Sequence, residues 1–368
     1  MNLTLQLASL FADKYKVIFL KIILGPFSLL YWIVLSFRNW CYDTNLFKSY
    51  EVPVAVVCVG NIKAGGTGKT PFTQYLLDHY SCIYKTAVLS RGYGRKTKGF
   101  ILADIQSTAE QIGDEPLQIL QHSHGNYAVA VCEDRVEGVT QLLNYIPDLQ
   151  LVILDDGFQH RKIKRDVNIL LTEYQKPFFV DYLLPLGLLR ESRKGAKRAD
   201  VLVVTKTPSS ERISDFNKKN LQKYLQQETP VFYTGIEYKN ICNAQINRGL
   251  SQNDQVILIT GIANPEPLVT YIKKKATIIE HVSCKDHYSY RLSDIQKLKS
   301  IRINAPNAII LTTEKDWVKL FPLISKEENL DDWYYLPIGL NLYAEKESLF
   351  SAIDKRINKR LNNLLNNY

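Results

Sequence analysis

Residues 59–71 have the sequence Val59-Gly60-Asn61-Ile62-Lys63-Ala64-Gly65-Gly66-Thr67-Gly68-Lys69-Thr70-Pro71. The segment that leads into them, 54–59, is apolar and rich in β-branched residues, which predicts a short buried strand. Apolar residues follow at helical spacing, so a helix should begin near Gly68. Glycines between a strand and a helix allow backbone N–H groups to surround a phosphate, with Lys69 on the β/γ-phosphates and Thr70 on Mg²⁺. The stretch therefore predicts a nucleotide-binding phosphate loop.

The loop departs from the common pattern at one position. Lys63 stands five residues before Gly68, where a glycine is usual. A second lysine together with Gly65-Gly66 is typical of partitioning-type ATPases, so a membrane-surface ATPase switch with a deviant phosphate loop is the alternative function. A glycine-rich turn without a ligand is a further alternative, which the strand before the loop and the helix after it disfavour.

Length and composition set broad limits on the class of protein. The 368 residues are enough for two domains, each with a full core. A formal charge of +9 favours an anionic partner such as a membrane surface or a phosphorylated substrate. The basic residues do not interleave with aromatic ones, which argues against a nucleic-acid binder. The six cysteines have no CxxC spacing, which predicts a reducing compartment and no zinc site.

The N-terminal segment is the compositional exception, because residues 17–37 are almost entirely apolar. Lys21 and the Gly25-Pro26 pair interrupt this run, and neither flank alone supplies the roughly 20 apolar residues of a spanning helix. Basic residues surround large aliphatic and aromatic side chains here. This pattern predicts two short helices in a membrane interface, within residues 1–40. The alternative is a helical pair packed on the first domain.

Strand-like and helix-like segments alternate along the rest of the chain. The alternation predicts βαβ units, and so an α/β fold like that of phosphate-loop NTPases, with a mostly parallel sheet flanked by helices. The expected strands are 86–90, 127–132, 151–154, 167–171, 201–205, 255–260, 276–280 and 308–313.

The same pattern suggests a division into domains. Residues 41–230 are expected to form the core domain, 231–250 a linker, and 251–368 a second, smaller α/β domain with a C-terminal helix. The polar stretch 208–229 is expected to be a surface helix.

Acidic residues at two places are candidates for the chemistry. Asp155 and Asp156 follow an apolar strand, at the sheet edge where ligands bind, and would suit a magnesium site opposite the phosphate loop. Asp114 and Glu115 open a predicted helix. Helix capping by Asp114 is the simpler interpretation, whereas a carboxylate there is also able to accept a proton from a hydroxyl.

Three other segments are weaker candidates. The loop 90–95 places Arg91 and Tyr93 between glycines, which suits the binding of a phosphate or a sugar, or a plain turn. His287 follows an aspartate in a polar loop, and a surface histidine is the simpler interpretation. The segment 189–198 is the densest basic run. A GTPase is a third function class, suggested by Thr205-Lys206 and by 314–316.

Together these segments resemble the tetraacyldisaccharide 4′-kinase family, the lipid A kinases of bacterial outer-membrane lipid synthesis. Seven stretches carry the resemblance in order, and they span most of the chain: 60–71, 90–94, 113–116, Asp155-Asp156-Gly157-Phe158-Gln159-His160, 185–191, 286–287 and 312–316.

The resemblance implies an ATP-dependent kinase that phosphorylates the 4′-hydroxyl of a lipid-linked glucosamine disaccharide 1-phosphate. It also implies Mg²⁺, a peripheral or monotopic location on the cytoplasmic face of the inner membrane, and no obligate protein partner. Lys63 then belongs to the variable interior of a longer loop that begins at Gly60. The nucleotide-binding residues implied are Gly60, Asn61, Gly65, Gly66, Thr67, Gly68, Lys69 and Thr70.

The resemblance assigns roles to further residues. Asp114 matches the general base and His287 the histidine that orients it, so the two are expected to meet. The chain has Tyr288 and Cys284 where members often carry a second histidine and an aromatic residue, which leaves His287 as the only histidine of the pair. Other implied catalytic residues are Lys69, Arg190 and Glu191; implied substrate contacts are Asn61, Arg91, Tyr93 and His160; implied metal or water-positioning residues are Thr70, Glu115, Asp155 and Asp156.

Overall fold

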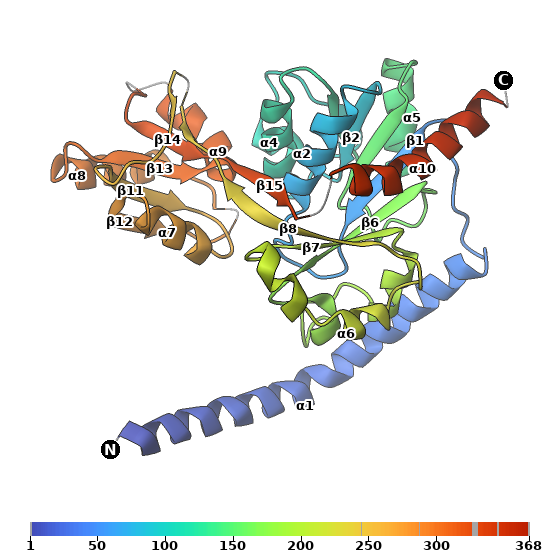
Figure 1. The fold of residues 1–368 in the computed structure, drawn as a ribbon, viewed down its shortest axis with the longest axis horizontal. Helices are drawn as coiled ribbons and strands as arrows, with labels where there is room; N and C mark the ends of the chain where they lie inside the picture. Colours follow the sequence, from blue (N-terminus) through green and yellow to red (C-terminus); the bar gives the residue numbers. More distant parts are fainter. Residues whose placement is uncertain (1, 244, 287, 326–329, 344–345, 367–368) are drawn as a thin grey trace. The chain divides into compact units, whose positions relative to one another are not determined.

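The computed structural model describes residues 2–243, 245–286, 288–325, 330–343 and 346–366. The chain divides into two compact units. Figure 1 labels helices and strands of each unit. Unit 1 comprises Met1–Lys69, Asp156–Thr234 and Leu342–Tyr368, and unit 2 comprises Thr70–Asp155 and Gly235–Asn341. The chain therefore passes between the units several times, and neither unit is one continuous segment.

Unit 1 is built on parallel strands in the order β8-β7-β6-β1. Their register places Val57 beside Val167 and Leu170 beside Leu202. The elements of this unit are α1 (Asn2–Asp43), β1 (Ala55–Gly60), β6 (Val167–Glu173), β7 (Val201–Thr205), α6 (Lys218–Gln222), α10 (Lys346–Leu365) and the short 3₁₀ helices Phe178–Val180, Arg193–Arg198 and Ser210–Asp215. Strands β8 (Val231–Tyr238) and β15 (Ile338–Leu342) each cross a boundary between the units.

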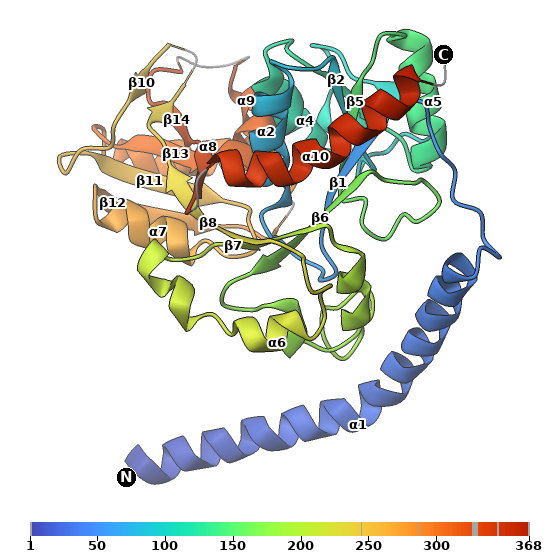
Figure 2. The same ribbon diagram turned by 45° about the vertical axis from the view of Figure 1, so that its right-hand side comes forward.

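The core of unit 1 contains a cluster of aromatic and aliphatic side chains from β6, β7, β8 and the segments around α6. Phe158, Phe178 and Ile62 are among its fully buried members. Helix α10 packs on β1 and β6 with Leu349, Ile353 and Ile357 buried (Figure 2). Ile62 and Phe158 belong to the phosphate loop and to the segment after Asp156, so this core supports both.

Helix α1 is one continuous helix, whereas the sequence predicts two short ones. It passes through Pro26, which lacks the N–H for one helical hydrogen bond. Pro26 removes only this one donor, so the helical hydrogen bonds resume on either side of it. The sequence also predicts that neither flank of the interruption alone is long enough to span a membrane. As part of one continuous helix, Lys21–Asp43 is long and apolar enough to do so by length and composition.

Unit 2 contains a first group of strands in the order β5-β2-β4-β3, of which only β3 is antiparallel to its neighbour. The elements are α2 (Lys69–Tyr80, which begins on the last residue of unit 1), β2 (Thr86–Ser90), β3 (Ile101–Leu102), α3 (Ala109–Ile112), α4 (Asp114–Ser123), β4 (Ala128–Val131), α5 (Arg135–Tyr145) and β5 (Leu151–Asp155). Helix α4 packs on β4. Asp114 is the first residue of that helix.

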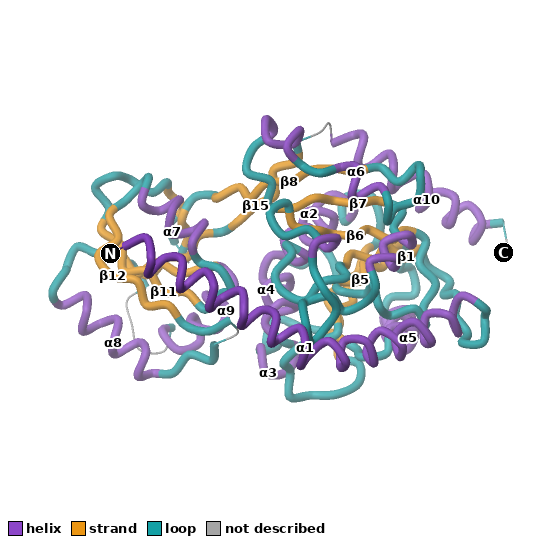
Figure 3. The backbone as a smooth tube through the Cα atoms, turned by 90° about the horizontal axis from the view of Figure 1, so that it is seen from below, coloured by secondary structure: helices purple, strands orange, loops and turns teal. Residues whose placement is uncertain are grey.

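A second sheet of unit 2 has the strand order β10-β9-β14-β13-β11-β12. Its elements are β9 (Ile241–Cys242), β10 (Asn247–Arg248), β11 (Gln255–Thr260), α7 (Glu266–Lys273), β12 (Thr277–Ser283), α8 (Leu292–Ile303), β13 (Ile309–Thr313), α9 (Glu314–Ile324) and β14 (Trp333–Leu336). Ile257 and Val256 of β11 belong to two different clusters, one with α8 and α9 and one with α7. Figure 3 shows α7 and α8 on either side of this sheet.

The predicted fold class is confirmed: mostly parallel strands flanked by helices, a second α/β sheet, and an apolar N-terminal helix. Strands β2, β7 and β11 have the predicted bounds. The surface helix predicted over 208–229 is wrong, because two short helices form there. The side chain of Asn217 accepts a hydrogen bond from the Asn220 N–H and thereby starts α6 as a new helix.

The N-terminus of α5 provides a test of the fold. The Asp134 carboxylate accepts hydrogen bonds from the backbone N–H groups of Val136 and Glu137, at 3.0 and 3.4 Å. We expect Asp134→Ala to lower the free energy of unfolding by about 1 kcal/mol, measured by denaturant titration. Asp134→Asn keeps an acceptor and should be close to wild type, as should Asp148→Ala at an exposed position. Equal stability of Asp134→Ala and wild type would contradict the capping role.

Candidate active site

The phosphate loop, residues 61–68, connects β1 to the first residue of α2. Gly68 has a φ of 80°, a left-handed conformation that residues with a side chain rarely adopt. Thr205, at the end of β7, donates its hydroxyl to the carbonyl oxygen of Thr67 at 2.9 Å. Gly65 and Gly66 have free space beside them: a Cβ atom added to either glycine would meet no atom of the described residues within 4 Å. The backbone of the loop therefore borders open space where a phosphate fits.

The segment after Asp156 lies directly against the start of this loop. A Cβ atom on Gly60 would lie 2.7 Å from the Cβ of Phe158 and 2.9 Å from its backbone nitrogen, so glycine is required there. The Gly157 N–H donates to the carbonyl oxygen of Val59 at 3.3 Å. Because Phe158 is fully buried, this contact sets where Asp156 stands relative to the loop.

Arg190 is the centre of the polar contacts around the loop. Its Nη1 and Nη2 donate to the two carboxylate oxygens of Asp156 at 3.0 and 2.7 Å, a bidentate pair. Nη2 also donates to the side-chain oxygen of Asn61, and the side-chain nitrogen of Asn61 donates to the Thr67 hydroxyl at 2.5 Å. Burial lowers the pKa of Arg190 and the hydrogen bonds to Asp156 raise it, with a net rise. The guanidinium is therefore a permanent cation beside the loop.

The backbone of the same segment also pairs with the loop. The Arg190 N–H donates to the carbonyl oxygen of Ile62 at 2.8 Å, and the Ala64 N–H donates to that of Leu188 at 2.7 Å. The residues 188–190 thus run alongside the phosphate loop, and a shift of either segment would move the other.

Gln159 and Glu191 form a second layer behind Asn61. The Gln159 side-chain amide donates to the carbonyl oxygen of Asn61 and to Glu191 Oε1, both at 2.7 Å. The other oxygen of Glu191 accepts from Arg198 at 2.7 Å, and Glu191 is only 3% exposed. The Glu191 carboxylate is thus engaged within the protein, which indicates that it positions Gln159 and, through it, the loop.

Lys69 and Asp156 carry opposite charges at the end of the loop. The Nζ atom of Lys69 is 3.8 Å from Asp156 Oδ2, and both side chains are partly exposed. Asp156 has a φ of 51°, an uncommon conformation for a residue with a side chain. Asp155, the residue before it, ends β5. The change of backbone direction after this strand end places the Asp156 carboxylate beside Lys69 and Arg190.

Lys63 does not extend into the open space beside the loop. It is 6% exposed, and its Nζ atom lies 2.9 Å from Asp181 and donates to the carbonyl oxygen of Lys176 at 3.1 Å. Burial raises the pKa of Asp181, whereas hydrogen bonds from Lys63 and two backbone N–H groups lower it to a value below the ordinary one. Lys63 therefore forms a structural ion pair, and the alternative of a partitioning-type ATPase loses its main support.

Within unit 2, Asp155 connects β5 to α2. Asp155 is fully buried, and its Oδ1 accepts a hydrogen bond from the Thr73 hydroxyl at 3.1 Å. Thr70 lies one turn earlier on the same helix and is 8% exposed. The Asp155 carboxylate therefore holds the helix that presents Thr70.

Asp114 is the first residue of α4, and Gly113 rather than Asp114 occupies the capping position. Lys319 of α9 lies 3.4 Å from the Asp114 carboxylate and 3.6 Å from that of Asp316. Asp316 is fully buried and accepts hydrogen bonds from the Gly261 N–H and the Thr313 hydroxyl at 2.9 and 2.7 Å. A helix N-terminus and a lysine both favour a negative charge on Asp114.

The other predicted site residues are less constrained by the structure. Arg91 and Tyr93 are exposed in the loop after β2, and Glu115 and His160 are partly buried. His287 lies outside the described residues, so its expected meeting with Asp114 stays a prediction.

Sequence reasoning missed several residues of this site. Gln159 had no interpretation from its own pattern, and Lys206, which donates to the Gly66 carbonyl oxygen, was considered only as a base-recognition signature. Lys319 could have been found from the sequence. It follows Asp316 by three residues on a helix that begins directly after a strand, and this spacing predicts an ion pair.

The residues around the loop fit a nucleotide triphosphate and a divalent cation. Backbone at 65–66 borders open space, and the partly exposed Lys69 and Asp156 offer charges of both signs. Among the described residues, no group of three or more His, Cys, Asp or Glu side chains is placed to hold a metal ion. A cation with few carboxylate ligands suits Mg²⁺, which shares its coordination with substrate phosphates and water.

Comparisons with known proteins agree with this geometry. The tetraacyldisaccharide 4′-kinase of Cytophaga hutchinsonii is 55% identical over 341 residues, which cover 92% of this chain and 97% of that protein. The enzyme of the same name from Flavobacterium psychrophilum is 40% identical over 344 residues, with 92% and 96% covered. The crystal structure of LpxK from Aquifex aeolicus in complex with ATP has a TM-score of 0.74 and 30% identity, and covers 92% of this chain and 99% of its own.

A family-wide comparison gives the same result. The family described as Tetraacyldisaccharide-1-P 4′-kinase matches residues 20–358 of this chain. That range contains the phosphate loop, Asp114, Arg190 and the second sheet. Kinases of this family transfer phosphate to a hydroxyl, and the chain belongs to the tetraacyldisaccharide 4′-kinase family.

Proposed function

We propose that this chain transfers the γ-phosphate of ATP to the 4′-hydroxyl of tetraacyldisaccharide 1-phosphate, as its family membership implies. The observation that carries the proposal is the phosphate loop with Arg190 bound at once to Asn61 and Asp156. Phosphoryl transfer needs positioned cations and fixed geometry more than covalent chemistry by the protein. Lys69 and Arg190 supply cations, and the contacts of Asn61 and Gln159 supply a fixed loop.

Asp114 is the proposed general base. It is the first residue of α4, and the Lys319 ammonium lies 3.4 Å from its carboxylate, whose ionised form is the one that accepts a proton. His287 is proposed to orient it, as the family resemblance implies. A buried Asp316 on the other side of Lys319 keeps that lysine in place.

Mg²⁺ is the proposed metal, with Thr70, Glu115, Asp155 and Asp156 as candidate ligands or holders of its water. When bound, such an ion neutralises the charge that develops on the phosphate oxygens. Asp156 is the one of the four that belongs to unit 1, and its carboxylate is partly exposed beside Lys69. Asp155 is fully buried against Thr73, so its proposed role is to hold α2.

The membrane-facing element is proposed to be α1, lying at the cytoplasmic surface of the inner membrane. Ile22, Leu29, Ile33, Phe37 and Trp40 recur at helical spacing and are each at least half exposed. An exposed apolar stripe of this length is unusual for a surface that meets only water. Inserting it among acyl chains would place the enzyme at its lipid substrate.

The direct test of the proposal is transfer of γ-³²P from ATP to a detergent-solubilised tetraacyldisaccharide 1-phosphate. We expect wild type to label the lipid and Lys69→Ala to be at least about 100-fold slower, because a cation on the transferring phosphate is lost. Lys164→Ala, which breaks an exposed ion pair with Glu51, is the matched control and should act like wild type. Well-folded wild-type protein that labels no lipid would overturn the proposal.

Asp114→Asn tests the assignment of the base. It removes the proton acceptor at nearly constant volume, so kcat should fall by roughly 10²–10⁴-fold while the KM for ATP changes far less. Asp104→Asn, at an exposed site elsewhere in unit 2, is the control. Turnover of Asp114→Asn close to that of wild type would remove Asp114 from the mechanism, whatever the result for Lys69.

Membrane association is tested by sedimentation with anionic vesicles. Replacing Leu29, Ile33 and Phe37 together by serine should weaken binding by about 100-fold, if each side chain contributes about 1 kcal/mol. Serine at the exposed residues Ile83, Ile105 and Ile303 of unit 2 makes an equal number of changes away from α1. Equal losses for both triple variants would show that α1 is not the membrane contact.

A further inference from the structure

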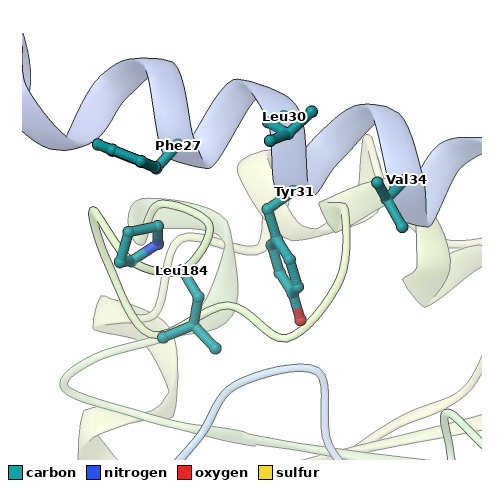
Figure 4. Close-up of a pocket in the computed structure, with 6 residues that line it drawn as sticks. Phe27, Leu30, Tyr31, Val34 and Leu184 are labelled. Carbon is teal, nitrogen blue, oxygen red and sulfur yellow. The ribbon is translucent and has the colours of Figure 1, made fainter.

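Tyr31 connects α1 to the segment that carries Arg190. Its hydroxyl donates a hydrogen bond to the carbonyl oxygen of Arg190 at 3.0 Å. In Figure 4 the ring extends from the helix toward the neighbouring loop, past Leu184. The guanidinium of that same arginine holds Asn61 and Asp156. One phenol hydroxyl thus connects the apolar N-terminal helix to the polar contacts around the phosphate loop.

Ser28 lies on the same side of α1 as Tyr31. It is 8% exposed, donates to the carbonyl oxygen of Leu183 at 3.2 Å, and accepts from the Leu186 N–H at 3.0 Å. It therefore holds the residues just before 188–190.

Arg38 makes a third contact of this kind, seven residues beyond Tyr31. Its Nη2 donates to the carbonyl oxygen of Gln159 at 3.0 Å. The side chain of Gln159 is the one that bonds Asn61 and Glu191. The side of α1 that faces the protein thus contacts both segments that support Asn61.

The apolar surface between α1 and the loop at 184–185 is open at this place. An open apolar groove of about 380 Å³ separates Phe27, Leu30 and Val34 from the loop residues Leu184 and Pro185 (Figure 4). Close packing sets distances within a core, whereas a groove leaves them adjustable. The hydrogen bonds of Ser28 and Tyr31 are therefore direct links between the helix and the loop beside this groove.

We propose that Tyr31 is a positioning residue for phosphoryl transfer, which holds the backbone of Arg190 so that its guanidinium keeps both Asp156 and Asn61. Helix α1 then has a second role besides contact with a membrane, since it helps to fix the site. The expected effect of Tyr31 on kcat rests on the proposed function. The expected effect of Tyr31 on the order of the backbone at Arg190 does not.

Tyr31→Phe removes only the hydroxyl and keeps the ring in the groove. We expect kcat for lipid phosphorylation to fall about five-fold, the size typical of one lost hydrogen bond, with vesicle binding and the KM for ATP unchanged within two-fold. Tyr42→Phe is the matched control on the same helix, since the described residues show no hydrogen bond of the Tyr42 hydroxyl. In an Arg190→Lys background, Tyr31→Phe should cause no further fall, because its effect passes through Arg190.

Hydrogen exchange followed by mass spectrometry tests the same idea without any turnover. The Arg190 N–H bonds to Ile62, and its exchange in peptides that cover 188–192 should be at least three-fold faster in Tyr31→Phe and unchanged in Tyr42→Phe. Unchanged exchange and unchanged kcat would overturn the proposal, as would an equal five-fold fall in the Arg190→Lys background. If wild type does not phosphorylate the lipid, or Arg190→Lys is inactive, the exchange rate alone decides.

Discussion

The bidentate contact of Arg190 with Asp156 is the interaction on which the candidate site depends. Asp156 stands at the end of one strand and Asn61 begins the loop after another, and Arg190 bonds to both. A lysine would not replace it, because one ammonium lacks the planar fork that engages two carboxylate oxygens and an amide together. The left-handed φ of Asp156 and the close approach of Gly60 to Phe158 act in the same direction. Both restrict how the phosphate loop and the segment that begins at Asp156 lie relative to each other.

Charge distribution at the site follows from this arrangement. Lys69 and Arg190 both lie beside the partly exposed carboxylate of Asp156. These two positive charges exceed the one negative charge that they pair with, so this part of the loop favours an anionic ligand. Lys63, the extra lysine of the loop, is neutralised by Asp181 and adds nothing to that balance. In unit 2 the order is reversed, with Lys319 between two carboxylates.

Much of this could be predicted from the sequence, because strong local patterns determine it. Buried parallel strands are continuous apolar runs, so β2, β7 and β11 were predicted at their observed bounds. The phosphate loop carries its own signature. The continuity of α1 through Pro26, the ion pair of Lys63 and the hydrogen bonds of Gln159 were not predicted. The last two depend on partners distant in sequence, Asp181 and Glu191, and no spacing rule contains that information. The first depends on how a helix tolerates one missing donor, which the Gly25-Pro26 pair does not reveal.

Under the proposed membrane contact, helix α1 meets two different environments, and different sides of the helix suit the protein and the acyl chains. The residues Ser28, Tyr31 and Arg38 fall on one side, whereas Leu29, Ile33 and Phe37 fall on another. Rotation of the helix by one residue, about 100°, would turn Ser28, Tyr31 and Arg38 toward the acyl chains. The same rotation would withdraw them from the loops to which they donate hydrogen bonds. Burial of the apolar stripe in a membrane therefore favours the same orientation that hydrogen-bonds Arg190. A medium that releases the stripe would weaken this preference without touching the phosphate loop itself.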